Sequence, residues 1–442
     1  MAGSFTKRGT IKSIVPGKEK GPSSKPALFF CCPRIPRKVR APRSSLSSRP
    51  EIRNEKAQAH EDEEMPLSWL RLRLAVNGLR YRYLRKTGGV SKPEALSLEI
   101  TRRCLAHCIM CNIWKTPPDL PELPLAEWMK VLSSPIFTNL RELDITGGEP
   151  FLRRDLLGLL EGICGLKGSH CQALRSVAIT TNGFLPLKIM EVVREAVPRM
   201  KEKYIDLVIA CGLDALGELH DEIRNFAGGW RRLQESIQGL LEIRDAHKNL
   251  VVGLKTTILP NNVDQLEDIA AYAEGKGLFL IISPFILTDN RFDNLDCKEV
   301  LQFHPGDIQK MIRFYEGGRF QWDYHRQAMI RFLKGGMMIK PCSAGFNYFF
   351  IRSTGDVFPC SIKNLILGNL RENSFETLIR SPAAKYFRKG AGRFPECRSC
   401  TEPGLERYSL PFEGFTYLSY SFKSGKENFL QLHHHMGLDK YF

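Results

Sequence analysis

Three cysteines are spaced so closely that their thiolates can bind one metal cluster. Cys104, Cys108 and Cys111 form a C-x3-C-x2-C pattern directly after an apolar run at residues 95–101. Three thiolates on one short loop can hold three corners of a 4Fe–4S cubane and leave its fourth iron open to another ligand. Structural metal sites usually close their coordination, so an open position predicts a catalytic site. A zinc site that uses these cysteines is the alternative.

A glycine pair follows the second apolar run. Gly147, Gly148 and Glu149 stand with Pro150 directly after residues 140–146. Glycine lacks a Cβ atom, which lets backbone groups come close to a ligand. A chain with C-x3-C-x2-C after its first predicted strand and GGEP after its second resembles the radical S-adenosylmethionine (radical SAM) enzymes.

That resemblance implies a cosubstrate and a reaction, with the three cysteines as candidate catalytic residues. In the family, the amino and carboxylate groups of S-adenosylmethionine chelate the open iron. Reductive cleavage then gives methionine and a 5′-deoxyadenosyl radical, which removes a hydrogen from the substrate. By resemblance, the backbone around Gly147, Gly148 and Glu149 receives the methionyl amino group, and Met110 occupies the apolar position near adenine.

Three further positions resemble family motifs after later strands. Asn182 belongs to a TNG sequence after the third predicted strand, where it could also cap the next helix. Asp214 follows the fourth strand, and Gly212 replaces the serine of many relatives, which removes a side-chain hydroxyl. Arg224 ends a stretch that resembles the family's HDxxR sequence. It either clamps the methionyl carboxylate by a bidentate hydrogen bond or forms a surface salt bridge, and His220 is expected to be structural.

A second group of cysteines lies in the last quarter of the chain. Cys342, Cys360, Cys397 and Cys400 could hold either zinc or a second 4Fe–4S cluster with complete ligation. Beside a radical SAM core, their spacing resembles the SPASM/twitch extension, which carries auxiliary clusters. No cysteine follows Cys400, so the resemblance implies one auxiliary cluster. Its expected role is to accept the second electron during oxidation of a small molecule or a peptide.

The elements between these motifs predict an α/β fold. Apolar strand-like runs alternate with amphipathic helical runs, which indicates βαβ units and a parallel sheet. Six such units fit a partial (β/α)6 TIM-like barrel followed by a small auxiliary iron–sulfur domain, with active groups at the carboxyl ends of the strands. The predicted strands are residues 96–101, 140–146, 176–181, 205–211, 251–258 and 278–285.

Composition divides the 442-residue chain further. Residues 1–64 are basic and rich in proline and serine, which predicts a disordered extension. Residues 65–92 predict a basic amphipathic helix. Packing on the barrel is the favoured interpretation because the charges are not cleanly segregated, and binding to a membrane surface is the alternative. The barrel is expected at 93–300 and the auxiliary domain with its linker helices at 301–403. The role of residues 404–442 is open, and His433, His434 and His435 are expected to form an exposed tail.

Charge and cysteine usage bear on partners and location. The chain has no apolar run long enough to span a bilayer. Thirteen cysteines without a secretory signal fit free thiols in a reducing compartment, which predicts a cytoplasmic protein. Of the net charge of +16, +7 lies in residues 1–64, and the surplus outside that segment suits an acidic ferredoxin or flavodoxin as electron donor, or an anionic substrate. No specific nucleic-acid motif is present.

Two classes of function therefore compete. The leading hypothesis is a two-cluster radical oxidoreductase that acts on a small molecule or matures a peptide. Residues 1–64 are too polar for the peptide-binding winged helix of many peptide-modifying relatives, which disfavours the peptide branch. The rival hypothesis is an interaction protein in which both cysteine groups bind structural zinc.

Overall fold

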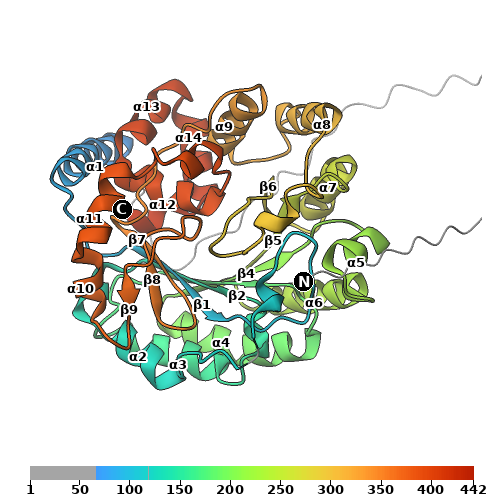
Figure 1. Cartoon of the computed structure of the whole chain (residues 1–442), viewed down its shortest axis with the longest axis horizontal. Coiled ribbons are helices and arrows are strands. Elements are labelled where there is room, and N and C mark those ends of the chain that lie inside the picture. The colour runs from blue at the N-terminus through green and yellow to red at the C-terminus, as the bar shows by residue number, and fades with distance from the viewer. Residues whose placement is uncertain (1–65, 118) are drawn as a thin grey trace, which may run out of the picture. The chain divides into compact units, whose positions relative to one another are not determined.

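The computed structural model describes residues 66–117 and 119–442, and the predicted disorder of residues 1–64 lies outside them. Its core is one nine-stranded sheet in the order β6-β5-β4-β3-β2-β1-β7-β8-β9 (Figure 1). Strands β1 to β7 pair in parallel, whereas β8 and β9 are antiparallel to their neighbours. This arrangement confirms the predicted α/β partial barrel.

All six predicted barrel strands are present, with ends that differ by at most two residues. They are predictable because strands of a parallel sheet are covered on both faces and form continuous apolar runs. Every residue of β1, for example, is buried. The strands are β1 (Ala95–Thr101), β2 (Glu142–Gly147), β3 (Ser176–Thr181), β4 (Asp206–Gly212), β5 (Leu250–Ile258), β6 (Phe279–Pro284), β7 (Tyr348–Ile351), β8 (Asp356–Phe358) and β9 (Gly368–Asn369).

Helices cross between the parallel strands and cover the outer face of the sheet (Figure 1). The first of these helices, α2, follows the cysteine loop and buries Trp128 and Leu132 against the sheet. The helices of the barrel are α2 (Leu125–Leu132), α3 (Leu156–Leu166), α4 (Pro186–Glu202), α5 (Glu218–Arg224), α6 (Gly229–Ala246) and α7 (Leu266–Gly275). Those outside it are α1 (Leu67–Thr87), α8 (Pro305–Glu316), α9 (Asp323–Leu333), α10 (Phe375–Arg380), α11 (Pro382–Gly390), α12 (Pro403–Glu413), α13 (Phe415–Lys423) and α14 (Lys426–His435).

The segment that holds the second cysteine group is continuous with the barrel sheet. Strand β7 pairs in parallel with β1, and β8 and β9 extend the sheet as short hairpin strands. The turn between β7 and β8 contains Gly355 at φ 94°, a backbone conformation that residues other than glycine rarely adopt. The auxiliary region therefore shares a sheet with the barrel.

The C-terminal segment, which could not be placed from sequence, contacts the amino ends of the barrel strands. Arg407 of α12 forms an ion pair with Glu142 of β2, and Tyr408 donates a hydrogen bond to Asp144. The histidines at 433–435 are not an exposed tail, contrary to the sequence-based expectation. They belong to α14, and His433 is buried in contact with the Tyr417 hydroxyl at 3.1 Å.

Helix α1 packs mainly on α12 and α13 rather than on the barrel helices. The contact is close because two glycines lie in it. A Cβ atom on Gly78 would lie 2.4 Å from the Phe415 ring, and one on Gly414 would lie 2.2 Å from the carbonyl oxygen of Leu74. None of the helices among the described residues is long and apolar enough to cross a membrane.

Candidate active site

The first cysteine group lies on the loop that leaves the carboxyl end of β1. Backbone hydrogen bonds fix this loop from α5, since His107 N donates to Arg224 O at 3.1 Å and Ile109 N to Ile223 O at 3.0 Å. On another side, Asn294 Nδ2 donates to the Met110 carbonyl at 2.8 Å. The loop that carries the three thiols is therefore held by distant parts of the chain.

The glycine pair packs against the start of that loop. Gly148 N donates to Thr101 O at 2.8 Å, and Glu149 N donates to Arg103 O at 2.8 Å. A Cβ atom on Gly147 would lie 2.1 Å from the Thr101 oxygen, and one on Gly148 would lie 2.2 Å from the Arg103 oxygen. Both positions must therefore be glycine because the cysteine loop passes too close to leave room for a Cβ atom. The sequence did not indicate this reason.

The Glu149 side chain connects the ends of β2 and β3. Its carboxylate accepts hydrogen bonds from Asn182 N at 2.8 Å, Thr181 Oγ1 at 2.9 Å and Phe151 N at 3.1 Å. Burial raises the pKa of Glu149 to about 7, although these hydrogen bonds oppose the shift. Glu149 therefore braces the site and does not line its cavity.

Asp214 and Arg224 form a buried ion pair beside the cysteines. Arg224 Nε lies 2.8 Å from Asp214 Oδ2, and Arg224 Nη1 lies 3.9 Å from Cys108 Sγ. The other Asp214 oxygen accepts a hydrogen bond from Thr257 N at 2.8 Å. His220 is buried, its Nδ1 accepts from the Asp214 amide at 3.3 Å, and burial lowers its pKa to about 3. Asp214 thus orients the Arg224 guanidinium, and His220 has the structural position expected of it.

Gly212 makes room for that guanidinium. A Cβ atom on Gly212 would lie 2.4 Å from Arg224 Nη2, so a serine at this position requires the arginine to move. The departure from the family pattern is therefore compensated, because Arg224 occupies the space of the missing side chain.

Replacing Gly212 with serine is expected to displace Arg224 from Asp214 and to raise the dissociation constant for S-adenosylmethionine about tenfold, the effect of losing one charge-assisted hydrogen bond. Equilibrium binding to the reconstituted protein measures this change. Gly168→Ser is the matched control, because no atom lies within 4 Å of its Cβ position and its φ is not positive. Unchanged binding by the Gly212 variant would show that Arg224 does not depend on this space.

One cavity brings the predicted residues together. All three cysteines line it, as do Gly147, Gly148, Met110, Asn182, Gly212 and Arg224. Of the predicted residues at this site, Glu149 and Asp214 lie behind the wall. Asn182 also caps its own turn, since Phe184 N donates to Asn182 Oδ1 at 2.9 Å.

Two cations in the cavity wall were not predicted. Lys255 comes from β5, and Arg291 reaches from the loop after β6 to Thr146 Oγ1 on β2 at 2.6 Å. Among the described residues, no acidic side chain forms an ion pair within 4.0 Å of either one, although both lower the pKa of the buried Glu402. Burial lowers the pKa of Lys255. The Glu402 carboxylate, which does not line the cavity, partly opposes this shift. The position of Lys255 near the end of a barrel strand could have indicated it, whereas no sequence signal marks Arg291.

The second cysteine group surrounds a separate cavity. All four predicted thiols line it, together with Lys340, Lys363 and the Phe387 ring. Burial, followed by the neighbouring thiols, raises the pKa of Cys342 to about 12. Burial likewise raises the pKa of Cys104 and Cys111 to about 12, so metal binding at either site must release protons.

The thiols of each cysteine group are arranged around a cavity. The residues that the structure describes contain no group of three His, Cys, Asp or Glu side chains close enough to hold one metal ion. A cubane separates its ligands more widely than zinc does, because each thiolate binds a different iron. Both sites thus offer thiols arranged around a cavity, the ligand type that a 4Fe–4S cluster requires.

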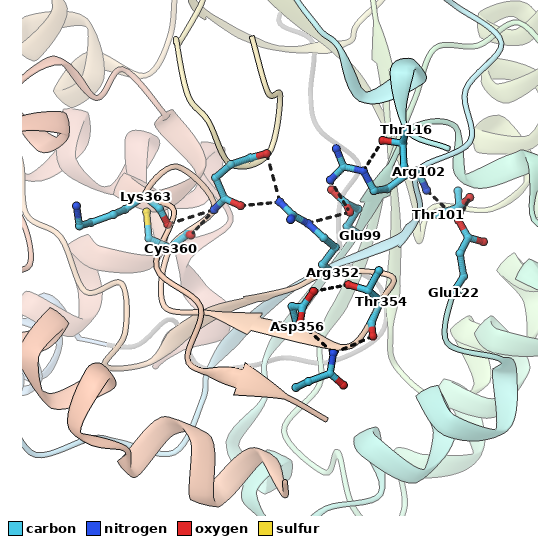
Figure 2. A network of polar contacts seen from close by, with 12 residues as sticks. Glu99, Thr101, Arg102, Thr116, Glu122, Arg352, Thr354, Asp356, Cys360 and Lys363 are labelled. Atoms are coloured by element: carbon cyan, nitrogen blue, oxygen red, sulfur yellow. Dashed lines mark hydrogen bonds and ion pairs between the residues drawn. The ribbon is translucent and has the colours of Figure 1, made fainter. Parts of the chain in front are cut away.

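A polar network joins the two cysteine loops (Figure 2). Asn290 donates to the carbonyl oxygen of Cys360 at 3.3 Å and accepts from Arg352 at 2.7 Å. Arg352 lies 3.5 Å from Glu99, and Glu99 lies 3.4 Å from Arg102, which precedes the first cysteine loop. Burial raises the pKa of Glu99, and the two arginines oppose that shift. The geometry of one loop is thus coupled to that of the other.

Known proteins share both halves of this architecture. Residues 98–294 match the Radical SAM superfamily, and residues 342–401 match SPASM, an iron–sulfur cluster-binding domain. The chain is 23% identical over 316 residues to the antilisterial bacteriocin subtilosin biosynthesis protein AlbA of Bacillus subtilis (strain 168), a match that covers 69% of this chain and 63% of AlbA.

Two further similarities extend this picture. The AdoMet-dependent heme synthase of Methanosarcina barkeri (strain Fusaro / DSM 804) is 25% identical, with 67% of this chain and 84% of that protein covered. The crystal structure of Streptococcus suis SuiB bound to precursor peptide SuiA matches with a TM-score of 0.51 and 17% identity, covering 80% of this chain and 78% of SuiB. The two family matches show that the chain belongs to the Radical SAM superfamily and carries a SPASM domain, and these domains imply 4Fe–4S clusters and S-adenosylmethionine as cofactors.

Proposed function

We propose that this enzyme oxidises a peptide substrate. Cys104, Cys108 and Cys111 hold the cluster that binds S-adenosylmethionine, and the second cysteine group holds one auxiliary 4Fe–4S cluster. The observation that carries the proposal is the single cavity that these three thiols share with the glycine turn and Arg224. When bound, the first cluster and S-adenosylmethionine supply an electron and a 5′-deoxyadenosyl radical that removes a substrate hydrogen.

The residues of the cavity bind and orient the cosubstrate. Arg224, held by Asp214, presents its two Nη groups to the methionyl carboxylate, and Nη1 also lies 3.9 Å from Cys108 Sγ. The backbone at Gly147 and Gly148 receives the amino group, and the buried Met110 side chain lies against the adenine. Phe285 and Phe292 also line the cavity and exclude water from the reacting centre.

The substrate carries an anionic group near the reacting carbon. Lys255 and Arg291 support this part of the proposal, because both line the cavity and neither forms an ion pair within 4.0 Å among the described residues, while the one Glu402 carboxylate balances only part of their charge. Similarity to AlbA and the fold shared with SuiB favour a peptide. The similarity to heme synthase supports a small carboxylate-bearing molecule as the second candidate.

Anaerobic purification tests the cofactor assignment. The protein is expected to be brown, to contain about eight irons, and to form 5′-deoxyadenosine from S-adenosylmethionine when dithionite is added. Colourless protein with stoichiometric zinc would instead support the structural zinc hypothesis.

Incubation with candidate peptides tests the substrate. A peptide with an acidic residue is expected to lose two hydrogen atoms, whereas its analogue with the corresponding amide is expected to react at least about tenfold more slowly. Mass spectrometry measures both reactions. Equal rates for the two peptides would remove the role assigned to Lys255 and Arg291, while deoxyadenosine formation would still support the radical SAM assignment.

A further inference from the structure

Helix α1 has a second apolar face that no described part of the chain covers. Its inner face packs on α12 and α13. Its outer face exposes five large apolar side chains at intervals of three and four residues. Two of them, Leu72 and Leu79, are 62% and 64% exposed. At 1.5 Å per residue they form a stripe about 21 Å long. The outer stripe consists of Trp69, Leu72, Val76, Leu79 and Tyr83.

Exposed cations border the outer stripe on both sides. With 3.6 residues per turn, Arg73 and Arg80 lie along one edge, and Arg82 and Lys86 lie along the other. All four side chains are exposed, and α1 contains no acidic residue. The charges that disrupt the pattern of the whole helix face inward, so the exposed face alone is cleanly segregated.

We propose that the outer stripe of α1 binds the surface of an anionic lipid membrane. A helix that lies in the membrane interface has an apolar strip with lysine and arginine beside it. Trp69 and Tyr83 stand near the two ends of the stripe, and such amphipathic aromatic rings favour the headgroup region. Because α1 is already folded against α12 and α13, it presents the stripe without paying the cost of ordering a helix on binding.

Charge disfavours the other possible occupants of the outer stripe. A second copy packed stripe to stripe would bring eight cations together without an acidic side chain from either helix to neutralise them. Residues 1–64 have 14 Lys and Arg against 7 Asp and Glu, so this segment is also repelled by the cationic borders. An anionic bilayer satisfies both the apolar strip and its borders.

Vesicle sedimentation of the full-length protein tests this proposal. The protein is expected to bind vesicles of phosphatidylcholine and phosphatidylglycerol at least about tenfold more tightly than vesicles of phosphatidylcholine alone. The double variant Leu72→Ser/Leu79→Ser is expected to lose about tenfold or more of that affinity. Leu187→Ser is the matched control, because Leu187 is 88% exposed on α4 and is expected to contribute nothing.

Three outcomes would overturn the proposal. They are equal sedimentation of the wild-type protein and the stripe variant, equal loss in the Leu187 variant, and a wild-type dimer that the stripe variant converts to a monomer. The last would assign the outer stripe to a second copy. Deoxyadenosine formation by the stripe variant is expected to be unchanged, which separates loss of membrane binding from misfolding and from failure of the proposed reaction.

Discussion

Replacing Cys104 with alanine is expected to abolish the formation of 5′-deoxyadenosine under dithionite. The three thiols of the first group lie on one loop and line the same cavity as Arg224 and the glycine turn. Two remaining thiols cannot hold a cubane in the position from which it reduces the sulfonium. Chromatographic assay of deoxyadenosine after anaerobic reconstitution measures the loss. Cys164→Ala is the control, since Cys164 is a buried cysteine of α3 outside both groups.

Replacing Cys397 with alanine is expected to leave cleavage of S-adenosylmethionine in place while substrate oxidation is lost. Uncoupled cleavage of S-adenosylmethionine should remain, and oxidation of the substrate should be lost with the auxiliary cluster. Cys397 suits this test better than Cys360, because the Cys360 carbonyl accepts a hydrogen bond from Asn290 in the network between the two loops. If the Cys104 variant still cleaves S-adenosylmethionine while the Cys397 variant does not, the two sites have been assigned in the wrong order.

The parts of the site that could be predicted from sequence are those set by local pattern. Buried parallel strands form apolar runs, and the rule that active groups follow such strands places Cys104, Gly147 and Asn182 together at one edge of the sheet. The cysteine spacing indicates the cluster because the ligands lie within one loop. Each of these inferences uses a short stretch of sequence.

The remaining parts depend on contacts between distant positions. Arg291 reaches the cavity by a hydrogen bond to Thr146 across 145 residues of sequence, from a loop with no regular pattern. The close fit of Gly212 to Arg224 depends on how α5 returns to the sheet. The same holds for α1, whose packing on the C-terminal helices decides which of its two apolar faces is exposed. Sequence periodicity identifies such a face but does not identify its partner.

Replacing Gly147 with alanine is expected to destabilise the protein by about 3 kcal/mol or more. A Cβ atom at this position would lie 2.1 Å from the carbonyl oxygen of Thr101, and backbone atoms cannot swing aside as a side chain can. The glycine also has φ 145°, which alanine adopts only with strain. Urea unfolding of the wild-type and variant proteins, followed by circular dichroism, measures the difference in the free energy of unfolding.

The control for this prediction is another glycine to alanine change. Gly165 lies within α3, and no atom lies within 4 Å of its Cβ position. Alanine there is expected to stabilise the protein by up to about 1 kcal/mol, because it favours the helix. A Gly147 variant as stable as the wild type would mean that the cysteine loop can retreat from the turn. Since Gly148 N and Glu149 N hold that loop by hydrogen bonds, such a retreat would also move the three thiols and lower the iron content of the protein.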